Sequence, residues 1–191
     1  GTPNIVKSIP QGYIVVSGNS ENKNQQVVCL DKNDPTQELW QLDLRSNNSN
    51  ENINIYGVEY TPYDGGRLVV LYSEDANDST YKESNQIKCK VFNFNTNKTP
   101  NLSFDFSGWN YSSNGKNESN QSTQQGGRLD TWAITPILNN NGPVTKYLIY
   151  CKEWYFDKHD DNGRTRFFLI DVTKTQEENT KEYSSLRIMW D

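Results

Sequence analysis

The sequence contains one histidine, one methionine and three cysteines among its 191 residues. Cys29, Cys89 and Cys151 are an odd number without CxxC spacing, so they predict neither a disulfide framework nor a zinc site. Each lies within an apolar run, where a free cysteine usually acts as a small buried hydrophobe. We expect no bound metal and no cofactor.

Clustered positive charge and long apolar runs are also missing. The net charge is −5 and the 19 Lys and Arg residues form no basic stripe, so nucleic acid is not an expected partner. No run approaches the roughly 20 apolar residues of a membrane helix, so a membrane would be reached only through a part outside this chain. The chain opens on Gly-Thr-Pro without a signal peptide, which we interpret as a processed form or a piece of a longer protein.

Short catalytic signatures are absent as well. No G-x-S-x-G, H-E-x-x-H, Walker or Rossmann pattern occurs, and all three cysteines lie inside predicted strands rather than beside a histidine. We therefore predict that the protein is not an enzyme. A glycosidase that uses paired loop carboxylates is the enzyme class left open.

Aromatic residues stand out against this polar background. Hydrophobic residues make up 33% of the chain and aromatic residues 12%, whereas disordered chains are poor in aromatic and β-branched residues. Trp, Tyr, Phe, Val and Ile favour strands. The composition predicts a thin β core with long polar loops, and the Asn-rich runs indicate an AT-rich genome.

Apolar segments recur three times in the same order. The three units span residues 4–44, 54–106 and 129–191, and each contains four extended segments. The predicted strands are 4–10, 13–18, 25–31 and 38–44, then 54–62, 67–73, 87–95 and 102–106, then 129–138, 146–154, 164–172 and 185–191.

The character of the segments changes in the same way within each unit. The first alternates, the second is almost continuously apolar, as in a strand covered on both faces, and the fourth carries Trp40, Phe104 or Trp190. This gradation is typical of a propeller blade. We predict a single all-β domain, 1–191, of about three propeller-like four-stranded antiparallel blades, with a β-sandwich as the alternative. Since closed propellers have about four to eight blades, further blades lie outside this chain or come from another chain.

Most of the extra length falls in connections at one end of each predicted blade. These are the second-to-third connections 74–86 and 153–164 and the links between units, 45–52 and 107–127. In an antiparallel blade both kinds of connection leave from the same end. We expect these loops to gather on one face of the protein, where function usually resides.

Candidate ligand-binding residues lie in or beside these loops. Aromatic rings cover the apolar faces of sugars while amides and carboxylates meet hydroxyl groups, so the loops predict a glycan or protein contact. A solvated hairpin tip and an aromatic packed at a blade edge are the alternatives, and a calcium loop fails because Asn162 stands where glycine is required. The candidates are Trp109, Tyr111, Trp154, Tyr155, His159, Asp160 and Asp161.

The segments "GYIVVSGN", "VVCLD" and "ELWQLDL", in an Asn-rich and loop-rich chain, resemble the surface proteins of mollicutes. Cytadherence proteins of that group carry an N-terminal propeller, and some bind sialylated host glycans. The resemblance implies an extracellular or cell-surface adhesin that contacts a host glycan or protein. The alternative function is a structural scaffold subunit of a multi-protein surface assembly.

Overall fold

Eleven β-strands make up most of the described part of the chain. The computed structural model describes residues 5–18, 25–45, 52–62, 65–75, 86–94, 98–110, 127–155, 163–175 and 177–179. Each strand coincides with a predicted segment to within a few residues, and the twelfth segment, 185–191, lies outside the described residues. The strands are β1 (Ile5–Ile9), β2 (Gly12–Gly18), β3 (Gln25–Asp31), β4 (Glu38–Leu42), β5 (Asn52–Thr61), β6 (Arg67–Asp75), β7 (Gln86–Phe94), β8 (Pro100–Asn110), β9 (Gly127–Pro136), β10 (Lys146–Tyr155) and β11 (Gly163–Asp171).

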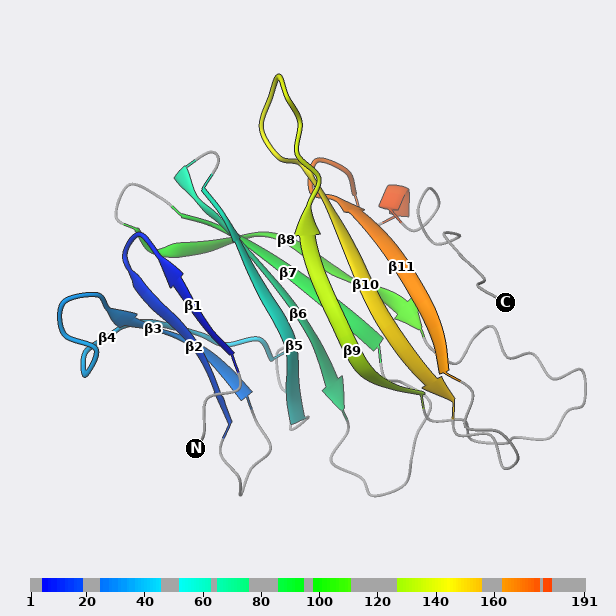
Figure 1. Ribbon diagram of the computed structural model, residues 1–191, viewed down its shortest axis with the longest axis horizontal. Coiled ribbons are helices and arrows are strands. Elements are labelled where there is room, and N and C mark those ends of the chain that lie inside the picture. The colour runs from blue at the N-terminus through cyan, green and yellow to red at the C-terminus, as the bar shows by residue number, and fades with distance from the viewer. Residues whose placement is uncertain are drawn as a thin grey trace, which may run out of the picture. The chain divides into compact units, whose positions relative to one another are not determined.

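The strands form three sheets, each made of the strands of one predicted unit (Figure 1). Sheet one has the order β1-β2-β3-β4, sheet two the order β5-β6-β7-β8, and sheet three the order β11-β10-β9. Within each sheet, strands consecutive in the chain are neighbours, and each pair with a described register is antiparallel. The predicted all-β class is confirmed, and none of the sheets closes into a barrel among the described strands.

The chain divides into two compact units. Unit 1 comprises Gly1–Asn77 and Cys89–Phe104, and unit 2 comprises Asp78–Lys88 and Asp105–Asp191. Sheet one lies in unit 1 and sheet three in unit 2, while β7 and β8 contribute residues to both.

Sheet one has one buried face and one open face, because side chains alternate along each strand. The buried face, which we call face A, carries Ile9, Ile14, Val16, Val27, Cys29 and Leu42. The opposite face, face B, carries Val6, Ser8, Tyr13, Val15, Val28 and Leu30, none of which is buried. The prediction that the second strand is covered on both faces is therefore wrong for β2.

Sheet two is buried on both faces, and its faces can be matched to those of sheet one. Pro10 and Pro62 each directly follow the first strand of their sheet, and the residues before them pair with Gly12 and Arg67. Matching Gly12 with Arg67 in this way makes Ile14 of sheet one equivalent to Val69 of sheet two. Face A of sheet two therefore carries Val69, Leu71, Cys89 and Val91, and face B carries Val58, Tyr60, Leu68, Val70, Tyr72, Phe92 and Phe94, with Tyr60 only partly buried.

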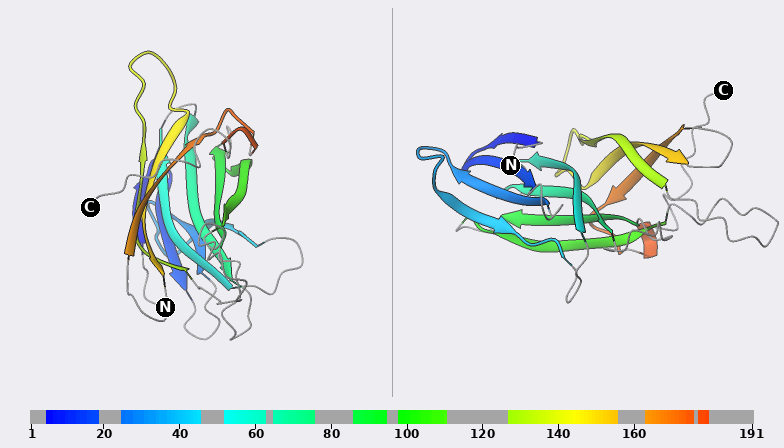
Figure 2. Two further views of the ribbon diagram at one scale, coloured as in Figure 1. Left: turned by 90° about the vertical axis from the view of Figure 1, so that its right-hand side faces the viewer. Right: turned by 90° about the horizontal axis from the view of Figure 1, so that it is seen from below.

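The core of unit 1 forms where face A of sheet one packs against face B of sheet two. Their buried apolar residues belong to one hydrophobic cluster, which excludes Val69 and Leu71 of the other face. The Trp40 ring of sheet one lies 5.8 Å from the Phe94 ring of sheet two, and Phe94 lies 5.9 Å from Tyr60. Figure 2 shows the blue strands of sheet one alongside the green strands of sheet two. Unlike faces of consecutive sheets therefore meet.

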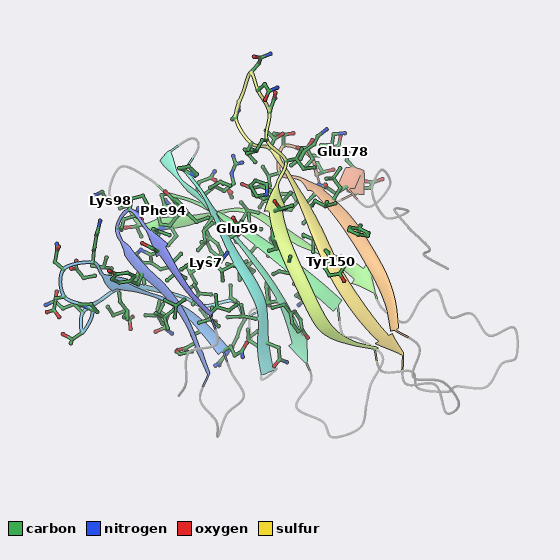
Figure 3. The ribbon with its side chains drawn as sticks, in the orientation of Figure 1. Lys7, Glu59, Phe94, Lys98, Tyr150 and Glu178 are labelled. Atoms are coloured by element: carbon green, nitrogen blue, oxygen red, sulfur yellow. The ribbon has the colours of Figure 1, made fainter. Side chains whose placement is uncertain are left out.

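The first strands of the two sheets are also joined directly. Lys7 Nζ and Glu59 Oε2 are 2.8 Å apart, and Figure 3 shows both side chains. Lys7 lies three residues before Pro10, and Glu59 lies three residues before Pro62. Corresponding positions of consecutive repeats thus form an ion pair between β1 and β5.

Sheet three also has one buried and one open face, but the two faces are exchanged relative to sheet one. Asp31 and Asp171 end the third strands of their sheets and pair with Gly12 and Lys146, so Ile14 corresponds to Leu148. Face B is the buried one here, with Ile134, Tyr147, Ile149 and Ile170. Face A is half-buried or exposed, with Ala133, Thr135, Leu148, Tyr150, Phe167 and Leu169. The second strand β10 is therefore also not covered on both faces.

The two aspartates also shape the turns that follow them. Asp31 Oδ1 accepts hydrogen bonds from the backbone N–H groups of Asn33 (2.7 Å) and Asp34 (2.9 Å). Asp171 Oδ1 accepts from the N–H (3.0 Å) and hydroxyl (2.6 Å) of Thr173. Aspartate favours turns because its carboxylate can satisfy backbone donors two residues ahead. The repeat thus includes the turn chemistry as well as the strand order.

A buried asparagine holds the segment after β11. Asn179 is 2% exposed, and its side-chain amide donates to the carbonyl oxygens of Asp171 (3.0 Å), Lys174 (3.3 Å) and Thr175 (3.0 Å). Thr175 and Glu178 form a reciprocal capping box at the single helical turn 177–179. The segment after β11 thus consists of a turn at 172–174 and a single helical turn at 177–179 among the described residues.

Candidate functional site

The candidate site lies at one end of sheet three, where two long connections meet. Tyr155, the last residue of β10, pairs with Gly127, the first residue of β9, and Trp154 pairs with Gly163, the first residue of β11. The connection 111–126 therefore leads into the same sheet end from which the connection 156–162 departs and returns. The backbone of two predicted aromatic residues stands at this junction.

A β-bulge precedes the two aromatic positions. The register between β9 and β10 shifts between Lys152 and Glu153, directly before Trp154. Bulges increase the local twist of a strand and occur often beside functional sites, where they redirect a strand end. The irregularity separates the regular part of sheet three from the end that carries the candidate site.

The other predicted site residues are placed less fully. Trp109 belongs to the last part of β8, so its backbone position is described but its side chain lies outside the description, as do the side chains of Trp154 and Tyr155. The remaining four, Tyr111, His159, Asp160 and Asp161, lie outside the described residues. The predicted site therefore stays a prediction, with two of its seven positions brought to one sheet end.

Unit 1 also gathers its long connections at one end. Gln25 begins β3, and its side-chain oxygen accepts a 2.6 Å hydrogen bond from the N–H of Ile55 near the start of β5. Asn52, the first residue of β5, pairs with Asp75, the last residue of β6. The strand ends from which the connections 19–24, 46–51 and 76–85 depart or to which they return therefore include several at this end of unit 1.

Lys90 connects β7 to the segment that follows β4. It is 8% exposed, its Nζ donates to the carbonyl oxygen of Leu44 at 3.3 Å, and it lies 5.8 Å from the Tyr72 ring centre. A buried lysine needs such partners because an isolated ammonium ion is costly to desolvate. Lys90 thus holds the chain beyond β4 against the middle of β7.

The opposite end of unit 1 is closed by short turns and aromatic packing. Gly65 and Gly66 have φ angles of 83° and 107°, which glycine adopts without strain. Trp40 Nε1 and Gln11 Oε1 are buried there without a hydrogen-bond partner in the described part of the chain. The turn glycines and the ring contacts of Trp40 give this end a structural role.

The described cysteines are unsuited to nucleophilic chemistry. Cys29 and Cys89 are buried, as predicted, and form no disulfide bond, whereas the side chain of Cys151 is not among those described. Burial, with a smaller contribution from the Asp31 charge, raises the pKa of the Cys29 thiol to about 11. Since the thiolate is the reactive form, Cys29 is inert at neutral pH.

Neither a metal site nor a membrane helix is found among the described residues. Within those ranges, no three His, Cys, Asp or Glu side chains lie close enough to bind a metal ion. The same part of the chain contains no helix with the length and hydrophobicity that a membrane crossing requires.

Sequence reasoning missed the open apolar faces of sheets one and three. Val6 is 59% exposed on face B of sheet one, and Ile137 is 40% exposed beside face A of sheet three. The available signal was the second strand of each unit, which is apolar on both sides although only β6 is buried on both. Large exposed apolar patches are often interaction surfaces.

Comparisons of the chain with protein-family models, curated proteins and solved structures find no match. The functional argument therefore depends on the geometry of this chain alone.

Proposed function

We propose that the chain is a non-catalytic binding module of a cell-surface protein, which contacts a glycan or a protein at the long-connection end of sheet three. The observation that carries the proposal is the register that joins Tyr155 to Gly127 and Trp154 to Gly163. This register brings the strand ends that carry two long connections and two aromatic positions to one end of sheet three. Loops held by a rigid sheet are the usual place for recognition.

We further propose that the sheets are blades of a propeller. In a propeller each blade packs one face against the opposite face of the next blade, whereas the two sheets of a sandwich bring their inner faces together. Face A of sheet one on face B of sheet two follows the first arrangement. The Lys7–Glu59 pair joins the first strands of the two sheets, but both residues lie on face A by register, so it supports neighbouring first strands and not the contact of unlike faces.

A glycan surface is the favoured form of the contact. Three of the candidate positions, at 109, 154 and 155, are aromatic and stand near strand ends, and the connection 111–126 is rich in Asn, Gln and Ser. Aromatic rings pack against the apolar faces of sugars, and amide side chains donate and accept hydrogen bonds with hydroxyl groups. This combination needs no metal and no catalytic pair.

Glycan-array binding tests the site with matched variants. We expect Trp109→Ala and Trp154→Ala each to reduce binding at least tenfold, while Leu138→Ala leaves it unchanged. Leu138 is a suitable control because it is 69% exposed and belongs to the turn at the opposite end of sheet three. Binding that survives in both tryptophan variants excludes the proposed site.

A scaffold role is the second candidate function, and the open apolar faces favour it. Face B of sheet one and face A of sheet three each expose aliphatic or aromatic side chains that a soluble monomer would normally cover. A scaffold subunit would use these faces for assembly and bind no small ligand at all.

A further inference from the structure

We propose that two copies of this chain associate head to tail, with face B of sheet one in each copy packed against face A of sheet three in the other. The inference builds on the proposed blade stacking and names the partner that the open faces fit. It requires no ligand at the site described above.

Face B of sheet one carries an apolar cluster bordered by polar residues, since Ser8, Ser17, Gln26 and Gln41 lie on the same face by register. Val6 pairs with Val15, and Val15 pairs with Val28, so three valines form one row across β1, β2 and β3. Tyr13 and Leu30 pair in the next row on this face. Val6 is 59% exposed and the others are half-buried, which leaves the row accessible.

Sheet two shows which surface covers a face of this kind. Its Val58, Leu68 and Val70 correspond to Val6, Tyr13 and Val15 of sheet one by the strand register. All three are at most 2% exposed and belong to the cluster formed with face A of sheet one. The complement of a face B is thus the face A of another sheet in the same repeat.

Sheet three presents such a face A without a cover in the described residues. Leu148, Tyr150, Phe167 and Leu169 are half-buried, and the rings of Tyr150 and Phe167 lie 5.4 Å apart. Leu148 corresponds to Ile14, which is fully buried in the same position of sheet one. Each copy therefore offers one open face of each type, and these are unlike faces that can satisfy each other.

Two copies are the smallest assembly that pairs every open face. A contact between unlike surfaces closes only when a rotation returns to the first copy, and otherwise continues into a filament. With three sheets in each chain, two copies contain six, within the range of about four to eight in closed propellers.

The size of the contact is sufficient for a dimer. A face of four strands, each about five residues long, measures roughly 16 Å by 19 Å from standard strand spacings, and the three strands of sheet three give roughly 16 Å by 14 Å. Two contacts bury two faces of each kind, on the order of 1,000 Å² in flat projection, which is about the minimum for a biological interface.

Sedimentation equilibrium with two single variants tests the proposal. We expect the unmodified chain to have twice the monomer mass at micromolar concentration. Val6→Asp on face B and Leu148→Asp on face A should each weaken association at least tenfold, whereas Leu138→Asp in the exposed turn should not. Circular dichroism confirms that each variant is folded.

Mixing the two weakened variants distinguishes unlike from like faces. The Val6→Asp copy keeps its face A and the Leu148→Asp copy keeps its face B, so the mixture regains one intact contact and should form a heterodimer. A monomeric unmodified chain, a dimer that resists either variant, or a mixture that stays monomeric overturns the proposal. Because the readout is mass, this result is independent of whether the tryptophan variants bind glycan.

Discussion

Val15 and Val16 are adjacent, chemically identical residues whose side chains lie on opposite faces of β2. Val16 is fully buried in the core of unit 1, whereas Val15 lies half-buried on the open face B. Replacing each by alanine therefore applies the same chemical change to two environments. The comparison measures which face of sheet one packs against sheet two.

The expected magnitudes follow from burial. Val16→Ala removes two methyl-sized groups, a transfer loss of about 1.6 kcal/mol, and leaves a cavity that adds about 1 kcal/mol. We expect a total loss of about 2–3 kcal/mol in the free energy of unfolding. Val15→Ala leaves no closed cavity and loses part of the transfer term, so it should cost about 1 kcal/mol or less.

The stability of unit 1 is measured by urea unfolding combined with hydrogen-exchange mass spectrometry of the β2 and β6 peptides. The measurement uses protein diluted until sedimentation gives the monomer mass, because a dimer would also bury Val15. Equal losses in the two variants, or a larger loss for Val15→Ala, would refute the assignment of the core to face A.

Three further predictions follow from individual contacts. A Cβ at Gly12 would lie 1.9 Å from a backbone carbonyl oxygen of β3, so Gly12→Ala should lower the free energy of unfolding by about 3 kcal/mol or more, measured by thermal or urea unfolding. A Cβ at Gly18 meets only a side chain, at 3.3 Å, so Gly18→Ala should lower it by less than about 1 kcal/mol. Because burial raises the pKa of Cys29, the stability that its neutral thiol contributes is present below pH 9 and lost as the pH rises through about 11. A Cys29→Ala variant should lack this loss of stability. Alkylation of Cys29 in the folded protein at pH 8 would contradict the raised pKa. A double-mutant cycle on Lys7 and Glu59 should give a coupling of about 0.3–1 kcal/mol that falls with added salt, and zero coupling at low salt would mean that β1 and β5 are not joined there.

The strand order was predictable because each unit repeats the same local pattern. Alternation in the first segment and an almost continuously apolar second segment located the strands to within a few residues. Turn chemistry reinforced the pattern, since Asp31 and Asp171 satisfy backbone donors ahead of them in the same way. Local signals of this kind do not depend on how sheets pack.

The burial of each face was less predictable, since it depends on neighbours far away in the sequence. Val15 and Val69 look equivalent by residue type, yet Val69 is fully buried and Val15 is not. The strand register places them on different faces of their sheets. A shift of one residue reverses every side chain of a strand, so residue type alone does not determine the packed face.

The candidate site was predictable only in its location. Alternating strand directions require the connections at 111–126 and 156–162 to meet at one end of sheet three, and the pairing of Tyr155 with Gly127 agrees. Which side chains point toward a ligand depends on loop conformations that strand patterns do not encode. The prediction that the long loops of all three sheets share one face stays a prediction, because these loops lie outside the described residues.

The central claim is that face A of sheet one packs against face B of sheet two. Proton–proton cross-relaxation between assigned side chains tests it most directly, because Trp40 belongs to one face and Phe94 to the other. The account predicts cross-peaks between the rings of Trp40 and Phe94, whose centres lie 5.8 Å apart, and between Phe94 and Tyr60. Cross-peaks from Trp40 to Val69 or Leu71 instead would place the opposite face of sheet two in the core and contradict the account.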